Sequence, residues 1–241
     1  MLVAGLDIET TGLNTEDDRV IELAVIVWDS TDNSILDIYD VFIANDRAIS
    51  EEITKLTGIK PAHVSAWGKT PFDAFTKAAE LLNNVDVVAA HNGSGFDKPF
   101  LQNEFRRHGL AFPQTPWLDT SVDVDYSEQI ATRKLSYLAL EHGFINPFPH
   151  RAFSDVLTML KVLSNYDMEK VFAASQEKKV SLLAVVKAPW QDSAPEGKKD
   201  ADIAKSLGYR WNGTIKKWVK IVRESKVAEE KQKAPFEIIT G

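Results

Sequence analysis

Apolar and polar residues alternate along the first segment of the chain. In residues 2–8 the even positions are all apolar, which predicts a strand with one apolar face. Asp7 and Glu9 share the other face of this strand. Residues 20–28 form a near-continuous apolar run, typical of a strand covered on both faces, and residues 35–43 predict the third strand of an antiparallel meander.

Helical patterns follow these three strands. Ser50 and the Thr70-Pro71 pair are residues that commonly begin helices. The apolar stripe expected after Pro71 consists of Phe72, Phe75, Ala79 and Leu82. Further expected elements are a strand at 85–90, a helix at 98–108, a strand at 117–120, and helices at 135–142 and 152–163. This order predicts an α/β domain, a mixed sheet flanked by helices, that ends near residue 174.

The last part of the chain differs in composition. The elements expected there are a strand at 180–186, a polar loop at 189–197 and a short helix at 202–207. Asn212-Gly213, between two runs that each contain a Trp, predicts a β-hairpin. We therefore expect two domains, residues 1–174 and a small α+β accessory domain at residues 175–241.

The composition is that of an ordinary globular protein. Of the 241 residues, 44% are hydrophobic and 26% are charged. The absence of cysteine excludes a disulfide scaffold and a Cys-ligated zinc site. The first ten residues carry two acids where a secretion signal needs a basic start, and no apolar run is long enough to span a membrane. We expect a cytoplasmic protein without a membrane partner.

Charge is distributed unevenly along the chain. Residues 198–233 contain eleven basic and five acidic residues, so they carry a charge of +6 although the whole chain carries −7. The rest of the chain therefore carries −13. An acidic body with a basic C-terminal stretch fits an enzyme that binds a polyanion away from an acidic metal site. An ordinary solvated tail is the alternative.

The pair Asp7 and Glu9 is the first candidate for chemistry. Acids at positions i and i+2 of a strand point the same way, about 6 to 7 Å apart at Cα, so both can reach one cation. Acidic pairs also occur on solvent-facing strands, where they only charge the sheet. The metal interpretation gains support from the turn that follows, Thr10 to Leu13, whose backbone and hydroxyl groups can contact a ligand.

A second acid, Asp97, follows the strand expected at 85–90 and precedes a predicted helix. Ligands of α/β proteins bind at the carboxyl ends of strands, so this Asp can face a site. It can equally be the N-cap of the helix, and the two roles are compatible.

His150 and Asp155 form the third group. Five residues of continuous helix would separate them by about 140°, so they cannot converge from one helix. They can converge if His150 belongs to the Pro-rich loop that includes residues 147–149 and Asp155 lies one turn inside the next helix. Histidine titrates near neutrality, which suits a general base. Four carboxylates and one imidazole are the groups that a two-metal phosphodiesterase needs.

These segments together resemble the DEDDh branch of the DEDD 3′–5′ exonucleases, the superfamily of the proofreading epsilon subunit of bacterial replicative polymerase and of RNase T. The matching motifs are DIETTGLN at 7–14, HNGSGFD at 91–97 and HRAFSD at 150–155. Thr57-Gly58-Ile59 and the segment 135–138 also resemble family positions. In one departure, three residues separate Asn92 from Phe96, where many members have two.

The resemblance, which covers about residues 1–170, implies an RNase H-like fold and two Mg²⁺ ions, for which Mn²⁺ can substitute. Asp7 would bridge both ions, Glu9 and Asp155 would complete the first site, and Asp97 would act directly or through water. His150 would deprotonate the attacking water. The residues expected to bind substrate are Thr10, Thr11, Gly12, Leu13, Asn92 and Phe96, with Leu13 as a wedge against the last base.

The activity expected from the resemblance is removal of nucleoside 5′-monophosphates from a free 3′ end, with single-stranded DNA favoured over RNA. Trimming of RNA ends is the nearest alternative. A non-catalytic module that binds nucleic acid or a polymerase subunit is the alternative from another class, and a replication or repair protein is a possible partner.

Aromatic and basic residues are interleaved between residues 207 and 218. Trp211 and Trp218 can stack bases while Lys and Arg contact phosphates. They can equally form the core of the small accessory domain, which needs large apolar residues. One Trp can serve each purpose.

Overall fold

The computed structural model describes residues 1–127, 129–188, 199–213 and 215–241. These residues form two compact units, Met1–Val124 with Lys134–Ser175, and Asp125–Arg133 with Gln176–Gly241. The short segment 125–133 thus belongs to the second unit, although the sequence analysis counted it in the first domain. Division into independent domains at residue 174 stays a prediction.

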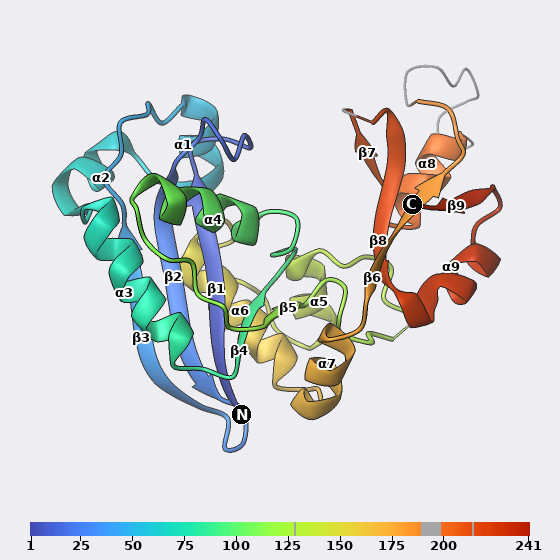
Figure 1. The fold of residues 1–241 in the computed structure, drawn as a ribbon, viewed down its shortest axis with the longest axis horizontal. Helices are drawn as coiled ribbons and strands as arrows, with labels where there is room; N and C mark the ends of the chain where they lie inside the picture. The colour runs from blue at the N-terminus through green and yellow to red at the C-terminus, as the bar shows by residue number, and fades with distance from the viewer. Residues whose placement is uncertain (128, 189–198, 214) are drawn as a thin grey trace. The chain divides into compact units, whose positions relative to one another are not determined.

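The first unit is built on a five-stranded sheet with the order β3-β2-β1-β4-β5. Its strands are β1 (Leu2–Thr10), β2 (Val20–Asp29), β3 (Ser34–Phe42), β4 (Val87–Ala90) and β5 (Trp117–Asp119). The first three strands are antiparallel, and β4 and β5 run parallel to β1. β1 is therefore the central strand, with the meander on one side and the parallel strands on the other (Figure 1).

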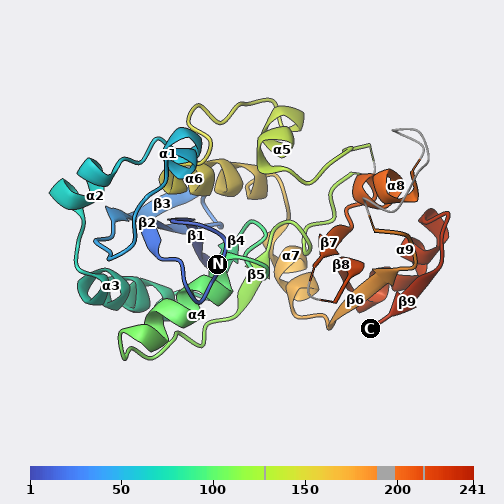
Figure 2. The same cartoon turned by 90° about the horizontal axis from the view of Figure 1, so that it is seen from above.

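Helices cover both faces of this sheet. They are α1 (Glu51–Thr57), α2 (Pro61–Trp67), α3 (Pro71–Asn83), α4 (Asp97–Arg107), α5 (Leu135–Glu141), α6 (Ala152–Leu163) and α7 (Met168–Ser175). Figure 2 shows α3 and α4 on one side of the sheet and α5 and α6 on the other. The predicted mixed sheet flanked by helices is confirmed. The sequence analysis did not predict α2 and α7.

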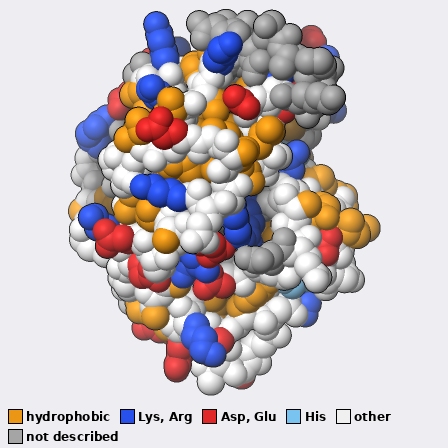
Figure 3. Space-filling view, turned by 90° about the vertical axis from the view of Figure 1, so that its right-hand side faces the viewer, with side chains coloured by type: hydrophobic (Ala, Val, Ile, Leu, Met, Phe, Trp, Pro, Cys, Tyr) orange, Lys and Arg blue, Asp and Glu red, His pale blue; other side chains and the backbone are white. Residues whose placement is uncertain are grey.

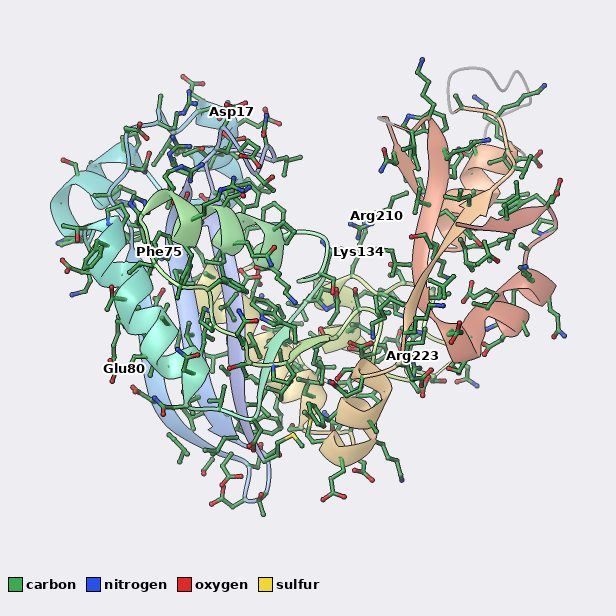
Figure 4. The ribbon with its side chains drawn as sticks, viewed as in Figure 1. Asp17, Phe75, Glu80, Lys134, Arg210 and Arg223 are labelled. Carbon is green, nitrogen blue, oxygen red and sulfur yellow. The ribbon has the colours of Figure 1, made fainter. Side chains whose placement is uncertain are left out.

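Helix α3 shows how local sequence and core packing combine. Thr70 accepts a hydrogen bond from the backbone N–H of Asp73 (3.2 Å), and Pro71 occupies the first turn. Phe75, labelled in Figure 4, is fully buried on the face turned to the sheet. Phe72, which we expected on the same stripe, is instead 55% exposed. It lies at the second position of the helix, before the first residue of α3 that packs in the core.

Close packing between β1 and α6 depends on Gly5. A Cβ at this position would lie 2.8 Å from Val156 Cγ1 and 3.0 Å from both terminal methyl carbons of Leu160. Glycine therefore lets α6 lie directly against the central strand. Asp155 precedes Val156 in the same helix, so this contact also sets where that carboxylate is placed.

The second unit is built on a four-stranded sheet with the order β7-β8-β6-β9. Its elements are β6 (Lys179–Ala184), α8 (Asp200–Ser206), β7 (Arg210–Asn212), β8 (Lys217–Arg223), α9 (Val227–Lys233) and β9 (Ile238–Thr240), with a 3-10 turn at Glu224–Lys226. The predicted hairpin is confirmed as β7 and β8. The loop expected at 189–197 lies outside the described residues, and α9 and β9 were not predicted.

An ion-pair cluster explains why the segment 125–133 belongs to this unit. Arg223, which Figure 4 labels at the end of β8, is buried and pairs with Asp125 and with Glu177 (3.4 Å). Lys226 also contacts Asp125, at 3.3 Å. A buried guanidinium needs acidic partners. These ion pairs therefore hold Asp125, and the segment that it begins, against the second unit.

The surface shows charges of both signs. On the face in Figure 3, acidic and basic side chains are mixed with hydrophobic ones. None of the helices in the described part of the chain combines the length and the apolar composition that crossing a bilayer requires.

Replacing Gly5 by Ala should destabilise the first unit by about 1–3 kcal/mol, because the added methyl group overpacks the contact with α6. Urea denaturation measures this free energy of unfolding. In the Gly5→Ala background, Val156→Ala removes the nearest clashing carbon, so the double variant should lose less stability than the sum of the single variants. Additive losses in the free energy of unfolding would show that the side chains at the two positions are not in steric conflict.

Candidate active site

Two carboxylates of the site come from the carboxyl-terminal half of β1. Leu6 and Ile8 are buried in the core, whereas Asp7 and Glu9 are partly exposed on the opposite face of the strand. The alternation predicted from the sequence is therefore present. It sets both carboxylates on one side, where α6 also packs.

Asp155 and His150 come from the start of α6 and the loop before it. The backbone N–H of His150 donates to Asp155 Oδ2 (3.1 Å), and the Asn146 side-chain amide donates to Oδ1. Ligand atoms of Glu9, His150 and Asp155 lie within 4.8 Å of one another. His150 is exposed and has a left-handed backbone (φ 62°), an uncommon conformation for a residue other than glycine.

Asp97 is the first residue of α4 and is buried. The N-cap of this helix is Phe96, and no side chain caps it, so the N-cap role considered for Asp97 is wrong. Its Oδ1 atom is buried and has no hydrogen-bond partner among the described residues. A buried, unsatisfied carboxylate oxygen is costly and commonly marks a place for an ion or a water molecule.

Burial and mutual repulsion raise the pKa values of these acids. Burial raises the pKa of Asp7 far above its ordinary value, and four neighbouring carboxylates raise it further. In order of effect they belong to Asp97, Asp155, Glu9 and Glu22. Burial, followed by repulsion from Asp155, raises the pKa of Glu9 to about 8. Burial is also the main reason that the pKa of Asp97 rises to about 7.

The donor set fits divalent cations. Glu9, His150 and Asp155 bring three ligand atoms close together. Asp97 is close enough to Asp7 to raise its pKa. Carboxylate oxygens are the ligands that Mg²⁺ and Mn²⁺ prefer, and a cation would stabilise their ionised forms together. The unpartnered oxygen of Asp97 offers one further donor atom.

An ion pair between a buried acid and a partly exposed arginine, which was not predicted, holds the start of α6. Glu22 lies opposite Glu9 in the β1–β2 register and is 1% exposed. Arg151 donates to it through Nε (3.0 Å) and Nη2 (2.6 Å), and the backbone N–H of Ala152 donates as well (2.9 Å). This fixes the residue next to His150. The one feature of the sequence that could have indicated this ion pair is the position of Glu22 inside the apolar run of residues 20–28.

Asp119 has a similar supporting role behind Asp97, and it was also missed. It is buried at the end of β5 and accepts from the backbone N–H groups of Asn92 and Ser94, each at 3.0 Å, and of Ser121. These bonds fix the loop that leads into α4. An acid at the carboxyl end of a predicted strand was the sign that could have identified it.

The predicted substrate-binding residues lie in two loops. The Thr10 hydroxyl donates to the Gly12 carbonyl, and the Thr11 hydroxyl donates to Asp18 Oδ1 (2.8 Å), so the loop after β1 is braced by its own hydrogen bonds. Leu13 at its tip is 85% exposed. A rigid loop with an exposed apolar tip suits contact with a base.

The second loop contains Asn92 and Phe96. Asn92 has a left-handed backbone (φ 64°) and is partly buried. The Phe96 ring packs on Phe100, with ring centroids 4.9 Å apart, so much of it serves the core. The substrate roles of both residues stay predictions.

Comparison with known proteins identifies the family. The exonuclease family RNase_T matches residues 4–163. The chain belongs to this exonuclease family. The chain is 32% identical over 161 residues to a PolC-type DNA polymerase III of Mycoplasma genitalium, a match that covers 65% of this chain and 11% of the polymerase. The chain therefore spans about a tenth of the length of that relative. The predicted family is confirmed.

Solved structures share the fold of this chain. E. coli exonuclease I in complex with a dT13 oligonucleotide has a TM-score of 0.62 and 15% identity, over 98% of this chain and 68% of that one. The nuclease domain of 3′hExo, a DEDDh family member bound to rAMP, has a TM-score of 0.58 and 17% identity, over 68% and 90% of the two chains. At such low identity the likeness concerns the fold alone.

The metal-free protein should lose stability as the pH rises. In the folded state the pKa values of Glu9 and Asp97, about 8 and about 7, exceed those of the unfolded chain, which are about 4. Their stabilising contribution is complete below about pH 4 and is lost as the pH rises through 7 to 8. We expect the midpoint of thermal unfolding in EDTA to decrease from about pH 5 to about pH 8.

Mg²⁺ should reverse this loss, because it binds the ionised carboxylates. Excess Mg²⁺ should raise the unfolding midpoint more at high pH than at low pH. In the control variant Asp7→Asn, which lacks one of the charges, the metal-free midpoint should depend less on pH and Mg²⁺ should have little effect. Equal effects of Mg²⁺ in both proteins at every pH would contradict a cation site at these residues.

Proposed function

We propose that this chain is a metal-dependent 3′–5′ exonuclease that releases nucleoside 5′-monophosphates from the 3′ end of DNA. The observation that carries this proposal is the group of acidic side chains beside His150. Burial and neighbouring carboxylates raise the pKa of Asp7, and one carboxylate oxygen of Asp97 has no hydrogen-bond partner among the described residues. Such a group is costly unless it binds cations, and it has no structural purpose in a binding module.

The proposed roles follow from position. Asp7, Glu9, Asp97 and Asp155 would hold two divalent cations. When bound, these ions supply positive charge for the phosphate and for the leaving 3′ oxygen. His150, exposed on its loop, would take the proton of the attacking water. Arg151 and Glu22 would keep that loop in position for proton transfer.

The loop after β1 would hold the terminal nucleotide. Its hydroxyl groups are fixed by internal hydrogen bonds, so its backbone is arranged before substrate arrives. Leu13, exposed at the tip, would pack against the last base. A loop arranged in advance loses little conformational entropy on binding.

DNA is the preferred substrate in this proposal because the matched relative is a DNA polymerase III and a structural neighbour was solved with a dT13 oligonucleotide. A replication protein as partner has the same support. RNA trimming is the second candidate, since the 3′hExo domain was solved with rAMP. The two differ by recognition of the 2′-hydroxyl group.

Hydrolysis by the wild-type chain and by Asp7→Asn tests the proposal. On matched 3′-labelled and 5′-labelled strands of DNA and RNA, the wild type with Mg²⁺ or Mn²⁺ should release mononucleotides from the 3′ end, faster from DNA. Asp7→Asn should abolish this release while the protein stays folded by circular dichroism. A wild-type chain without activity on either polymer would leave the binding module as the function.

His150→Ala should separate proton transfer from metal binding. Loss of a general base lowers kcat by about 10²- to 10⁴-fold. The variant should nevertheless keep the rise in unfolding midpoint that Mg²⁺ causes, because the carboxylates remain. If the Mg²⁺-dependent rise disappears with the imidazole, His150 is a metal ligand and the proposed role as base is wrong.

A further inference from the structure

The second unit contains a pocket of about 610 Å³ between α8 and the β7–β8 hairpin. Its lining residues are Lys199, Ala201, Asp202, Lys205, Tyr209, Arg210, Trp211 and Trp218. All belong to the second unit, so the pocket does not depend on the active site of the first. Its volume is within the range of pockets that bind small ligands or a nucleotide.

Two tryptophans in this pocket have different environments. Trp218 is 5% exposed, belongs to the core of the unit, and donates from Nε1 to the Lys187 carbonyl (3.1 Å). Trp211 is partly exposed and packs edge-on against Trp218, with centroids 5.8 Å apart and an interplanar angle of 70°. Trp218 is therefore structural, and Trp211 presents ring surface to the pocket.

Tyr209 contributes a buried polar group to the pocket. The residue is 1% exposed, and its hydroxyl has no hydrogen bond in the described part of the chain. Burial, with a smaller effect from Glu230, raises the Tyr209 pKa to about 12, so the hydroxyl remains a donor at neutral pH. A buried hydroxyl without a partner costs free energy, which an acceptor atom of a ligand would recover.

The charge of the pocket is opposite to that of the chain. Among the described lining residues, Lys199, Lys205 and Arg210 accompany one acid, Asp202, in a protein whose net charge is −7. Lys205 is exposed on α8, and Figure 4 labels Arg210 at the start of β7. Positive charge beside a partly exposed aromatic ring matches a phosphate next to a base.

We propose that this pocket binds single-stranded nucleic acid, with one base stacked on Trp211 and the adjacent phosphates paired with Lys199, Lys205 and Arg210. The choice of nucleic acid rests on the proposed function of the chain. An acidic peptide would use the cations but not the flat ring surface. The pocket would be a second contact for the nucleic-acid strand, distinct from the active site whose carboxylates would hold the cations.

Binding is best measured apart from hydrolysis. The full chain carrying Asp7→Asn, in EDTA, is titrated against fluorescein-labelled oligo-dT of about 16 nucleotides, the upper site size of small single-strand-binding folds. Adding Trp211→Leu, which keeps an apolar side chain against Trp218, should weaken binding about 5- to 150-fold, the loss expected for one stacked base. An abasic strand of equal length should bind both proteins alike.

The basic side chains have a separate readout. Lys205→Ala/Arg210→Ala, at two exposed positions, should keep the fold and should reduce the slope of log affinity against log salt by about 1.4, that is about 0.7 for each single-strand phosphate contact. Lys231→Ala, an exposed cation on α9 outside the pocket, is the matched control. It should leave the preference for base-bearing over abasic strands unchanged.

Two results would overturn the proposal. Folded Trp211 and Lys205/Arg210 variants that bind oligo-dT as tightly as their parent would exclude the pocket as a nucleic-acid site. Polyglutamate that competes as well as unlabelled oligo-dT would make it a site for an acidic protein partner. Failure of the proposed exonuclease function is distinguishable, because it appears as absent hydrolysis by the wild type whatever the pocket variants bind.

Discussion

Repulsion between carboxylates gathered at one end of β1 is the constraint that the rest of this structure has to meet. Asp7 and Glu9 come from the strand, while Asp97 and Asp155 are brought to it by α4 and α6. Burial raises the pKa of Asp7 and the neighbouring carboxylates raise it further, while Asp97 keeps a buried oxygen without a hydrogen-bond partner among the described residues. The metal-free arrangement therefore costs free energy, and contacts outside the group must hold the acids until cations offset that cost.

Those contacts support the elements that bring Asp97 and Asp155 to the strand. The Glu22–Arg151 ion pair fixes the start of α6, Asn146 holds the Asp155 carboxylate, and Asp119 fixes the loop before α4. Gly5 lets α6 lie directly on the central strand. The chain thus builds its site from rigid elements braced by buried polar contacts, an arrangement in which the geometry precedes the ligand.

Local patterns were enough to predict every strand except β9, most helices and the main acids, because period-two alternation and helix caps act within a few residues. They were not enough for the supports. Arg151 is 129 residues from Glu22, and the sequence around either residue does not indicate that the two form an ion pair. Phe72 was placed wrongly because periodicity does not show where a helix enters the core. The grouping of segment 125–133 with the second unit has no local sign in the sequence, because it depends on the contact of Asp125 with Arg223, 98 residues away.

An acidic site cannot by itself attract a polyanion. Until cations are bound, the carboxylates around Asp7 repel phosphate, so affinity for nucleic acid has to come from another part of the chain. The +6 charge of residues 198–233 is the excess available for this, and the proposed pocket is where it coincides with the exposed surface of Trp211. Binding and hydrolysis would then respond to different variables. Affinity would follow monovalent salt, through the phosphate contacts, while turnover would follow the divalent cation that the carboxylates require.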